Sequence, residues 1–202
     1  LADEGLRRLN TIADHQAFDA GDILVREGDR AGWLFNITAG AVRVYKLLPD
    51  GRRQIVGFLF PGDFLGLASG DRYAYSADAL SAGNACRFHR KAYRGMLAEL
   101  PELEAALLDR ASHELQAAHN QMLLLGRKTA VERLASFLTD LAARERRAGG
   151  EGRVITLPMT RAEIADYLGL TTETISRVTS RLKTRGVIRL LSGLWVLGLA
   201  RA

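Results

Sequence analysis

The stretch MTRAEIADYLGLTTETISRVTSRLKTRG, Met159–Gly186, carries the signals of two helices separated by a glycine. Thr160 is followed three residues later by Glu163, a capping-box pattern that marks the start of a helix. Gly169 is placed to end that helix, and Thr171 is a suitable N-cap for the next one. Two short helices joined by a glycine-containing turn predict a helix-turn-helix.

The second of these helices has two different faces. Ile175, Val178 and Leu182 recur at the spacing of a buried apolar stripe. The opposite side combines one carboxylate with small hydroxyls and arginines, in the order Glu173, Ser176, Arg177, Ser180, Arg181 and Thr184. Because the second helix of a helix-turn-helix enters the major groove of DNA, we predict that this polar side contacts DNA.

Each residue type on the polar side has a partner in the groove. Arg177 can donate a bidentate pair to guanine O6 and N7, Glu173 can accept from cytosine N4, and Ser176 can do either. Taken alone, Glu173 and Arg177 would be read as an ordinary surface pair four residues apart. A carboxylate that faces a polyanion is costly unless it reads a base, so we predict base readout by all three. We expect phosphate contacts from Arg161, Thr171, Thr172 and Arg181.

Charge is unevenly distributed along the chain. Residues 1–126 contain 14 lysines and arginines against 16 aspartates and glutamates, a net charge of −2. Residues 127–202 contain 14 against 7, a net charge of +7. A basic module on a near-neutral body is typical of a nucleic-acid-binding domain joined to a regulatory domain. On charge alone, a basic solvated surface is an equal alternative.

The composition is that of a globular protein, with 202 residues of which 48% are hydrophobic and 25% charged. No apolar run approaches the roughly 18–20 residues of a membrane span, and no signal-peptide pattern opens the chain. We therefore expect no membrane partner. The single cysteine, Cys86, cannot form an internal disulfide, which favours a reducing compartment and hence the cytoplasm. Because the chain begins at Leu1 and not at Met, we expect it to be part of a longer protein.

Residues 1–100 are expected to form a domain of short strands. β-Branched and aromatic residues alternate with polar ones in Ala41–Tyr45, and turn signals such as Pro49–Gly51 recur about every 8–12 residues between residues 18 and 88. This pattern predicts a small antiparallel roll or barrel. Its corners are expected at the glycines Gly21, Gly28, Gly40, Gly51 and Gly62.

Residues 101–126 predict a long helix with an uncharged apolar seam. The seam residues recur at steps of three and four, as in a heptad: Leu108, Ala111, Leu115, Ala118, Met122 and Leu125. The seam could pack on the chain's own roll or on a second copy of the chain. A long helix that joins two domains has little of its own chain to cover it, so we predict a homodimer interface.

Residues 127–202 complete the predicted DNA-binding domain. The stretch RKTAVERLASFLTDLAARER reads as an amphipathic helix whose apolar side holds Val131, Leu134, Ala135, Leu138 and Leu141. After the helix-turn-helix, GVIRLL and LWVLGL on either side of Ser192–Gly193 predict a β-hairpin wing. The expected fold class is α+β: an N-terminal antiparallel β-roll, a long dimerisation helix and a C-terminal winged helix-turn-helix.

The helix-turn-helix sequence resembles the DNA-binding signature of the CRP–FNR transcription regulators. Its E-x-x-S-R core, Glu173, Ser176 and Arg177, is similar to the FNR and FixK branch, whereas the CRP branch would have Arg in place of Thr172. QMLLLGRKTAVERLASFL and LLPDGRRQIVGFLFPGDFLGLA also resemble that branch. The resemblance implies a roll of the cupin or cyclic-nucleotide-binding kind and dimerisation through the seam. It further implies a palindromic site with TTGAT-like half-sites, activation through RNA polymerase, and oxygen- or redox-linked gene control.

Three signals are compatible with such a family member, the first being a cyclic nucleotide. In CRP-type rolls, a Glu after F-x-G binds the ribose and an Arg before Ser/Thr-Ala binds the phosphate. Here Leu67 follows Phe64–Gly66, and Tyr75 precedes Ser76. A phosphate without Arg loses its bidentate partner, so we do not expect this chain to bind cAMP.

The second signal is an iron–sulfur cluster. FNR proteins that sense oxygen hold a [4Fe–4S] cluster with three N-terminal cysteines and one in the roll, where Cys86 falls. A cluster needs four thiolates, and the other three would have to precede Leu1. No cofactor is therefore expected in the chain as given. The alternative interpretation of Cys86 is a small cysteine of the core.

The third possibility is that the protein binds no small ligand and that its activity is controlled by its abundance, as in FixK-like regulators.

Other classes of protein fit the sequence less well. A regulator gated by a small effector inside the roll is one alternative. A cupin-like metal enzyme would need clustered ligands in the roll, yet the histidines are scattered, at His15, His89, His113 and His119. No HExxH, GxSxG, Walker or CxxC pattern occurs, so we predict that the protein is not an enzyme. A dimeric sensor without DNA binding is disfavoured by the basic E-x-x-S-R helix.

Overall fold

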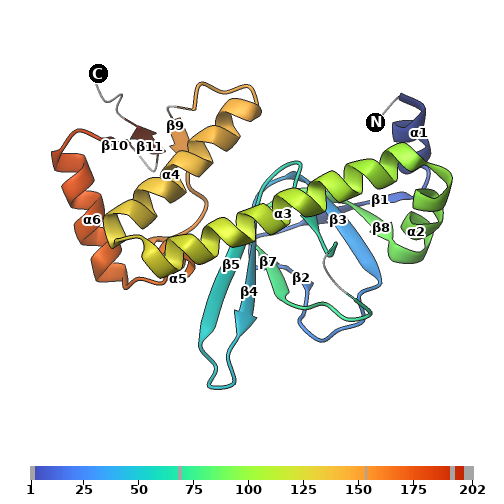
Figure 1. Cartoon of the computed structure of the whole chain (residues 1–202), viewed down its shortest axis with the longest axis horizontal. Coiled ribbons are helices and arrows are strands. Elements are labelled where there is room, and N and C mark those ends of the chain that lie inside the picture. Colours follow the sequence, from blue (N-terminus) through green and yellow to red (C-terminus); the bar gives the residue numbers. More distant parts are fainter. Residues whose placement is uncertain (1–2, 68–69, 153, 192–193, 198–202) are drawn as a thin grey trace. The chain divides into compact units, whose positions relative to one another are not determined.

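The computed structural model describes residues 3–67, 70–152, 154–191 and 194–197 (Figure 1). The chain divides into two compact units, Leu1–His119 and Asn120–Ala202. The long helix α3, Pro101–Arg127, contributes residues to both units, because the boundary between them falls within it.

The first unit is built around two four-stranded antiparallel sheets. One sheet has the strand order β1-β8-β3-β6 and the other β2-β7-β4-β5. The strands are β1 Ala13–Phe18, β2 Ile23–Val25, β3 Trp33–Ala39, β4 Val42–Leu47, β5 Arg53–Leu59, β6 Phe64–Leu65, β7 Ser76–Ala79 and β8 Gly83–His89. The antiparallel β-roll predicted from the sequence is therefore confirmed.

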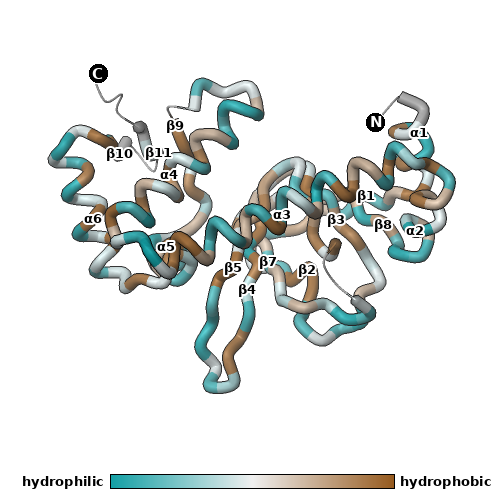
Figure 2. Tube along the Cα trace, in the orientation of Figure 1, coloured by the Kyte–Doolittle hydropathy of each residue, from teal (hydrophilic) through white to brown (hydrophobic). Residues whose placement is uncertain are grey.

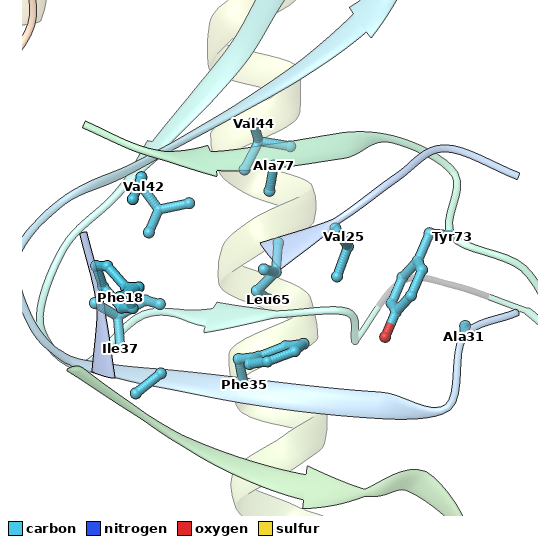
Figure 3. Packing of buried hydrophobic residues seen from close by; sticks show 12 residues of the cluster. Phe18, Val25, Ala31, Phe35, Ile37, Val42, Val44, Leu65, Tyr73 and Ala77 are labelled. Atoms are coloured by element: carbon cyan, nitrogen blue, oxygen red, sulfur yellow. The ribbon is translucent and has the colours of Figure 1, made fainter. Parts of the chain in front are cut away.

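Apolar side chains from both sheets fill the interior of the roll (Figure 3). On β4, the buried Val42 and Val44 alternate with the half-buried Arg43 and Tyr45, which is the period of a strand with one face toward a core. Fully burying a valine or leucine contributes about 1.5–3 kcal/mol. The residues of this cluster are Phe18, Val25, Ala31, Phe35, Ile37, Val42, Val44, Leu65, Tyr73, Ala77, Ala79 and Ala85.

The five glycines expected at corners of the roll, Gly21, Gly28, Gly40, Gly51 and Gly62, all have positive φ angles. Gly40 shows most clearly why no other residue fits. Its φ is 83°, and a Cβ atom there would lie 2.7 Å from the carbonyl oxygen of Ala82. A side chain at this corner would meet backbone that cannot move aside, so the glycine is needed for both conformation and space.

Two short helices of the first unit were not anticipated from the sequence: α1, Asp3–Asn10, and α2, Arg90–Glu99. α2 follows β8 directly, with His89 as its N-cap. Tyr93 and Met96 of α2 pack in a second apolar cluster with Phe88 of β8 and Leu103 of α3. This cluster attaches the first turns of α3 to the roll.

The second unit is a helix-turn-helix domain with a small sheet. Its elements are α4 Ala130–Arg147, β9 Val154–Thr156, α5 Arg161–Leu168, α6 Thr172–Thr184, β10 Ile188–Leu191 and β11 Leu194–Leu197. β10 and β11 pair antiparallel as the predicted wing, whereas its expected turn, Ser192–Gly193, lies outside the described residues. β9 adds a third strand that the sequence did not predict.

The buried side of α4 is shifted from the predicted one. Leu134, Leu138 and Leu141 are buried as expected, together with Phe137 and Ala142. The other two predicted members, Val131 and Ala135, are only half-buried. The apolar stripe of the helix is therefore wider than predicted, and Phe137 packs against Tyr167 of α5 with tilted rings whose centroids lie 5.6 Å apart.

Candidate nucleic-acid interface

The first helix of the motif, α5, begins at the predicted capping box. The Thr160 hydroxyl accepts from the backbone N–H of Glu163 at 3.2 Å, and the Glu163 carboxylate accepts from the backbone N–H of Thr160 at 2.6 Å. Two backbone donors that the helix itself cannot satisfy are thereby paired. The start of α5 is therefore fixed by local sequence.

The turn between the two helices depends on Gly169, which has φ 60° and ψ 43°. Its N–H donates to the carbonyl of Asp166 at 3.2 Å, and the N–H of Leu170 donates to the carbonyl of Ala165 at 2.9 Å. This is the hydrogen-bond pattern of a Schellman motif, which favours glycine at the left-handed position. The turn brings Thr171 directly to the start of α6.

The second helix, α6, is capped by Thr171, whose hydroxyl accepts from the backbone N–H of Thr174 at 3.2 Å. Ile175, Val178 and Leu182 have exposed fractions of 0%, 7% and 6%. The predicted apolar stripe is therefore buried in the domain, which leaves the opposite side of α6 to solvent.

The residues predicted to touch DNA lie on the accessible side of the helix-turn-helix. Glu173 and Arg177 are exposed and Ser176 is half-buried, all three on α6. The residues predicted to contact phosphates, Arg161, Thr171, Thr172 and Arg181, are exposed on α5, on α6 and at the turn between them. The face combines the backbone donors at the start of a helix with a carboxylate and exposed arginines.

The start of α6 favours the charged form of Glu173. Its carboxylate accepts from its own backbone N–H and from the Thr171 hydroxyl, and it lies near Arg177, so its pKa is lowered from the usual value. The Arg177 guanidinium donates to the Thr174 hydroxyl at 3.3 Å. The contacts that the described residues make with these two side chains come from α6 and its N-cap, so both can turn toward a base without disrupting the core.

The predicted seam of α3 is mostly uncovered in the single chain. Leu108, Leu115 and Met122 have exposed fractions of 62%, 58% and 62%, and Ala111 and Ala118 are exposed as well. Hydrophobic residues recur along α3 in Figure 2. The neighbouring Leu123, which the sequence did not single out, is 61% exposed.

Leu125, the last predicted member of the seam, behaves differently. It is half-buried, and its Cδ2 lies 3.3 Å from the point where a Cβ of Gly169 would stand. It therefore packs on the turn of the helix-turn-helix in its own chain.

Polar contacts also connect the end of α3 with that turn. Gln121 donates from Nε2 to the carbonyl of Tyr167 at 3.0 Å. Arg133 of α4 donates to carbonyls of both α3 and α5. Sequence reasoning missed these two residues, because a backbone acceptor leaves no signature in the sequence.

In the roll, Cys86 is half-buried and its Sγ lies 3.6 Å from Nδ1 of His15. Among the described residues, no group of three or more His, Cys, Asp or Glu side chains could hold a metal ion. Leu67 packs against the second apolar cluster. The Tyr75 hydroxyl accepts from the N–H of Gly66 at 3.0 Å. Both residues thus contribute to the packing of the roll.

The sequence did not reveal one buried ion pair of the roll. Arg43 of β4 and Asp78 of β7 are directly opposite in the strand register, and Nε of Arg43 lies 2.6 Å from Oδ1 of Asp78. Their side chains are 19% and 10% exposed. The signal that could have found this pair is the single charged residue, Asp78, within the otherwise uncharged stretch SADAL.

No helix in the described part of the chain is both long enough and apolar enough to span a bilayer.

Comparison with family models agrees with the two-unit structure. The model of the Crp-like helix-turn-helix domain matches residues 132–201, and that of the cyclic nucleotide-binding domain matches residues 15–99. Together they cover the roll and most of the second unit.

Individual relatives cover nearly the whole chain. The transcriptional activatory protein AadR of Rhodopseudomonas palustris is 42% identical over 88% of this chain and 74% of its own. The nitrogen fixation regulation protein FixK of Bradyrhizobium diazoefficiens is 40% identical over 93% of this chain and 79% of its own. The solved structure of FixK2 from Bradyrhizobium japonicum superposes with a TM-score of 0.83 at 37% identity, over 92% of each chain.

A roll that resembles a cyclic-nucleotide-binding domain, followed by a winged helix-turn-helix with an exposed E-x-x-S-R face, defines a DNA-binding transcription regulator and not an enzyme. The chain belongs to the CRP/FNR family, in its FixK-like branch. The fold class and the type of regulator predicted from the sequence are confirmed by these findings.

Proposed function

We propose that this regulator is a homodimer that binds a two-fold symmetric DNA site with TTGAT-like half-sites and activates transcription through contact with RNA polymerase in the cytoplasm. The observation that carries the proposal is the two-sided character of α6. Its apolar stripe is buried to 7% exposure or less, while Glu173 and Arg177 project into solvent from the turns that enter a major groove first.

Base readout rests on the three E-x-x-S-R side chains. Arg177 donates its fork to guanine O6 and N7, and Ser176 donates or accepts beside it. The pKa of Glu173 is lowered by its own N–H, by the Thr171 hydroxyl and by the nearby charge of Arg177, and its exposed carboxylate can exchange these partners for the N4 amino group of cytosine. TTGAT contains one guanine and, on the complementary strand, one cytosine, which suits one arginine and one carboxylate per half-site.

Arg161, Thr171, Thr172 and Arg181 set the position of the helix by binding phosphates. The threonines lie at the start of α6, where backbone N–H groups and the helix dipole favour an anion. The net charge of +7 on residues 127–202 draws the domain to DNA over a longer range. These contacts give affinity, while the base contacts give specificity.

The exposed seam of α3 is the proposed contact between the two copies. Leu108, Leu115 and Met122 are each about three-fifths exposed in the single chain. A heptad row of uncharged residues packs well against its own copy in a coiled coil. We propose that the dimer forms without a cofactor, because no charge lies in the seam to oppose it.

The proposed signal is the abundance of the protein, in the context of oxygen- or redox-linked gene control. The positions of Leu67 and Tyr75 give a cyclic nucleotide no carboxylate and no guanidinium there. A [4Fe–4S] cluster at Cys86 requires three further cysteines that residues 1–202 do not contain. Three clustered cysteines in the encoded sequence before Leu1 would replace this proposal by oxygen sensing.

The test is a binding titration by fluorescence anisotropy at fixed salt. A duplex with two inverted TTGAT half-sites is compared with a scrambled duplex of the same composition. We expect tighter binding to the palindrome by at least about a thousandfold, the low end for specific DNA-binding proteins, and two chains per duplex. Equal affinity for both duplexes would reject the proposed site.

A further inference from the structure

Arg133, near the start of α4, donates to four backbone carbonyls. Nε donates to Lys128 at 3.0 Å, and Nη2 donates to Leu125 at 2.7 Å. Nη1 donates to Leu168 at 2.9 Å and reaches Gly169 at 3.4 Å. The first two acceptors lie at the end of α3 and just after it, and the other two lie at the end of α5.

The carbonyls of Leu125, Leu168 and Gly169 are among the groups that a helix leaves unpaired at its end. The last four carbonyls of an α-helix have no partner within it, and they carry the negative end of the helix dipole. One guanidinium therefore neutralises two helix ends at once. Its planar fork of five N–H donors can span separated acceptors, which the compact ammonium of lysine cannot do.

Leu125 and Arg133 both lie close to Gly169 at the end of α5. A Cβ at Gly169 would lie 3.3 Å from Cδ2 of Leu125 and 3.4 Å from Nη1 of Arg133. Gln121 adds a second polar contact, to the carbonyl of Tyr167 at 3.0 Å. The last turns of α3 and the turn before α6 are thus held together by both packing and hydrogen bonds.

We propose that Arg133 is a positioning residue that fixes the recognition helix α6 to the dimerisation helix α3, and so sets the spacing of half-sites that the dimer accepts. The inference rests on the proposed function, because it requires two copies joined through α3. The acceptor Leu125 lies on α3 only three residues after Met122 of the seam. If the helix-turn-helix rotated about the hydrogen bonds of Arg133, α6 would therefore move relative to the partner copy. Half-sites of a symmetric dimer lie about 34–36 Å apart, and this distance must be held for both helices to bind at once.

Two other roles for Arg133 make different predictions. A phosphate contact would contribute to the salt dependence of binding, with a slope change of about one on removal. A purely structural role would weaken binding to all duplexes equally, in step with a loss of stability. Only a positioning role changes the preference for one half-site spacing over another.

The experiment compares the full chain with Arg133→Met and Arg133→Lys, and with Arg147→Met as a control that removes the same charge from the other end of α4. Each protein is titrated by fluorescence anisotropy with three duplexes. One has the preferred palindrome spacing, one has a base pair inserted between the half-sites, and one has a single half-site. Light scattering and thermal unfolding establish that each variant is dimeric and folded at the assay temperature.

We expect wild type and Arg147→Met to prefer the correct spacing strongly. In Arg133→Met that preference should fall by about tenfold or more, equivalent to ~1.4 kcal/mol of discrimination, with single half-site affinity nearly unchanged. Arg133→Lys keeps the charge but not the fork, so it should lose the preference as well, and it carries the test if Arg133→Met does not fold. An unchanged preference in the folded variants overturns the inference, as does a change confined to the salt slope. Wild type without any spacing preference overturns instead the proposed dimeric binding mode.

Discussion

Arg177 and Arg181 are one helical turn apart on α6 and carry the same charge, yet we expect Arg177 to read a base and Arg181 to bind a phosphate. Replacing Arg177 with Ala should cost about 1–3 kcal/mol of binding to the TTGAT palindrome and relax preference at one position of each half-site. The reason is the loss of a bidentate pair to guanine. Competition titrations with duplexes that vary that position measure the change.

Arg181→Ala is the matched control for this prediction. A lost phosphate contact should weaken binding to all sequences by a similar factor and lower the slope of log K against log salt by about 0.9. If Arg177→Ala weakens TTGAT and scrambled duplexes equally, the assignment of base readout to Arg177 is wrong.

The pH dependence of Glu173 follows from its place at the start of α6. Its pKa is lowered, first by its own backbone N–H and then by the Thr171 hydroxyl and Arg177. A depressed carboxyl pKa contributes stability that is present above the unfolded pKa and is lost as pH falls through the folded one. As the pH falls from 8, Glu173 should therefore stay ionised to a lower pH than an unperturbed glutamate, whose pKa is about 4.3. An NMR titration of its carboxyl carbon should show a midpoint below that of Thr171→Ala, which lacks the hydroxyl donor, and an equal midpoint in both would contradict the assignment.

Thr179 is the one residue of the buried side of α6 that brings a polar atom there. It is 3% exposed, and its hydroxyl has no hydrogen-bond partner in the described part of the chain. A buried hydroxyl without a partner costs about 1–3 kcal/mol by mutational data. Thr179→Val keeps the shape and removes that atom, so we expect unchanged or raised stability in urea unfolding. A loss above about 1 kcal/mol, typical of a removed hydrogen bond, would show that the hydroxyl is paired.

At the scale of elements, Gly169 is needed both for its backbone conformation and for the space that it leaves to its neighbours. Its left-handed conformation ends α5, and its missing side chain admits Leu125 and Arg133. Gly169→Ala should cost about 1–2 kcal/mol for the positive φ alone, and more if the neighbours at 3.3–3.4 Å cannot move. Thermal or urea unfolding measures the loss. Gly186→Ala is a suitable control, since its φ is 69° but nothing lies within 4 Å of the added Cβ. If both variants lose the same free energy of unfolding, the close contacts at Gly169 do not contribute to the cost.

The elements that the sequence predicted are those whose signals are local. The capping box of α5, the glycine turn and the apolar stripe of α6 each lie within a few residues, and the structure contains all three. β9 is three residues long and exists through pairing with β11, which is distant in sequence. α2 follows β8 without a break and is stabilised by Phe88 and Leu103, so its own ten residues gave too little periodicity to predict it.

The same distinction applies to the candidate site. Glu173, Ser176 and Arg177 could be named from spacing because one helix fixes their common face. Arg133 reads as one more polar residue of an amphipathic helix. Its function in the structure depends on carbonyls of Leu125 and Leu168, and only folding brings these acceptors to it.

At the scale of the whole molecule, dimerisation can be tested by placing one charge in the seam of α3. Ala118 is exposed in the single chain and would lie between two copies in the dimer. Ala118→Glu would bury two facing carboxylates, and burying an unpaired charge costs several kcal/mol. We expect wild type to be a dimer at micromolar concentration by light scattering and Ala118→Glu to be a monomer with weak palindrome binding but intact half-site binding.

The neighbouring Ala117→Glu introduces the same side chain one residue outside the seam, and it should remain dimeric because its carboxylate stays in water. Ala117 is exposed on the same helix, so helix propensity and net charge change equally in the two variants. Dimers of both variants would mean that the copies meet elsewhere than along Leu108, Leu115 and Met122. A monomeric wild type would reject the proposed homodimer and, with it, the proposed palindromic site. The proposed readout of a single half-site by α6 would not be affected.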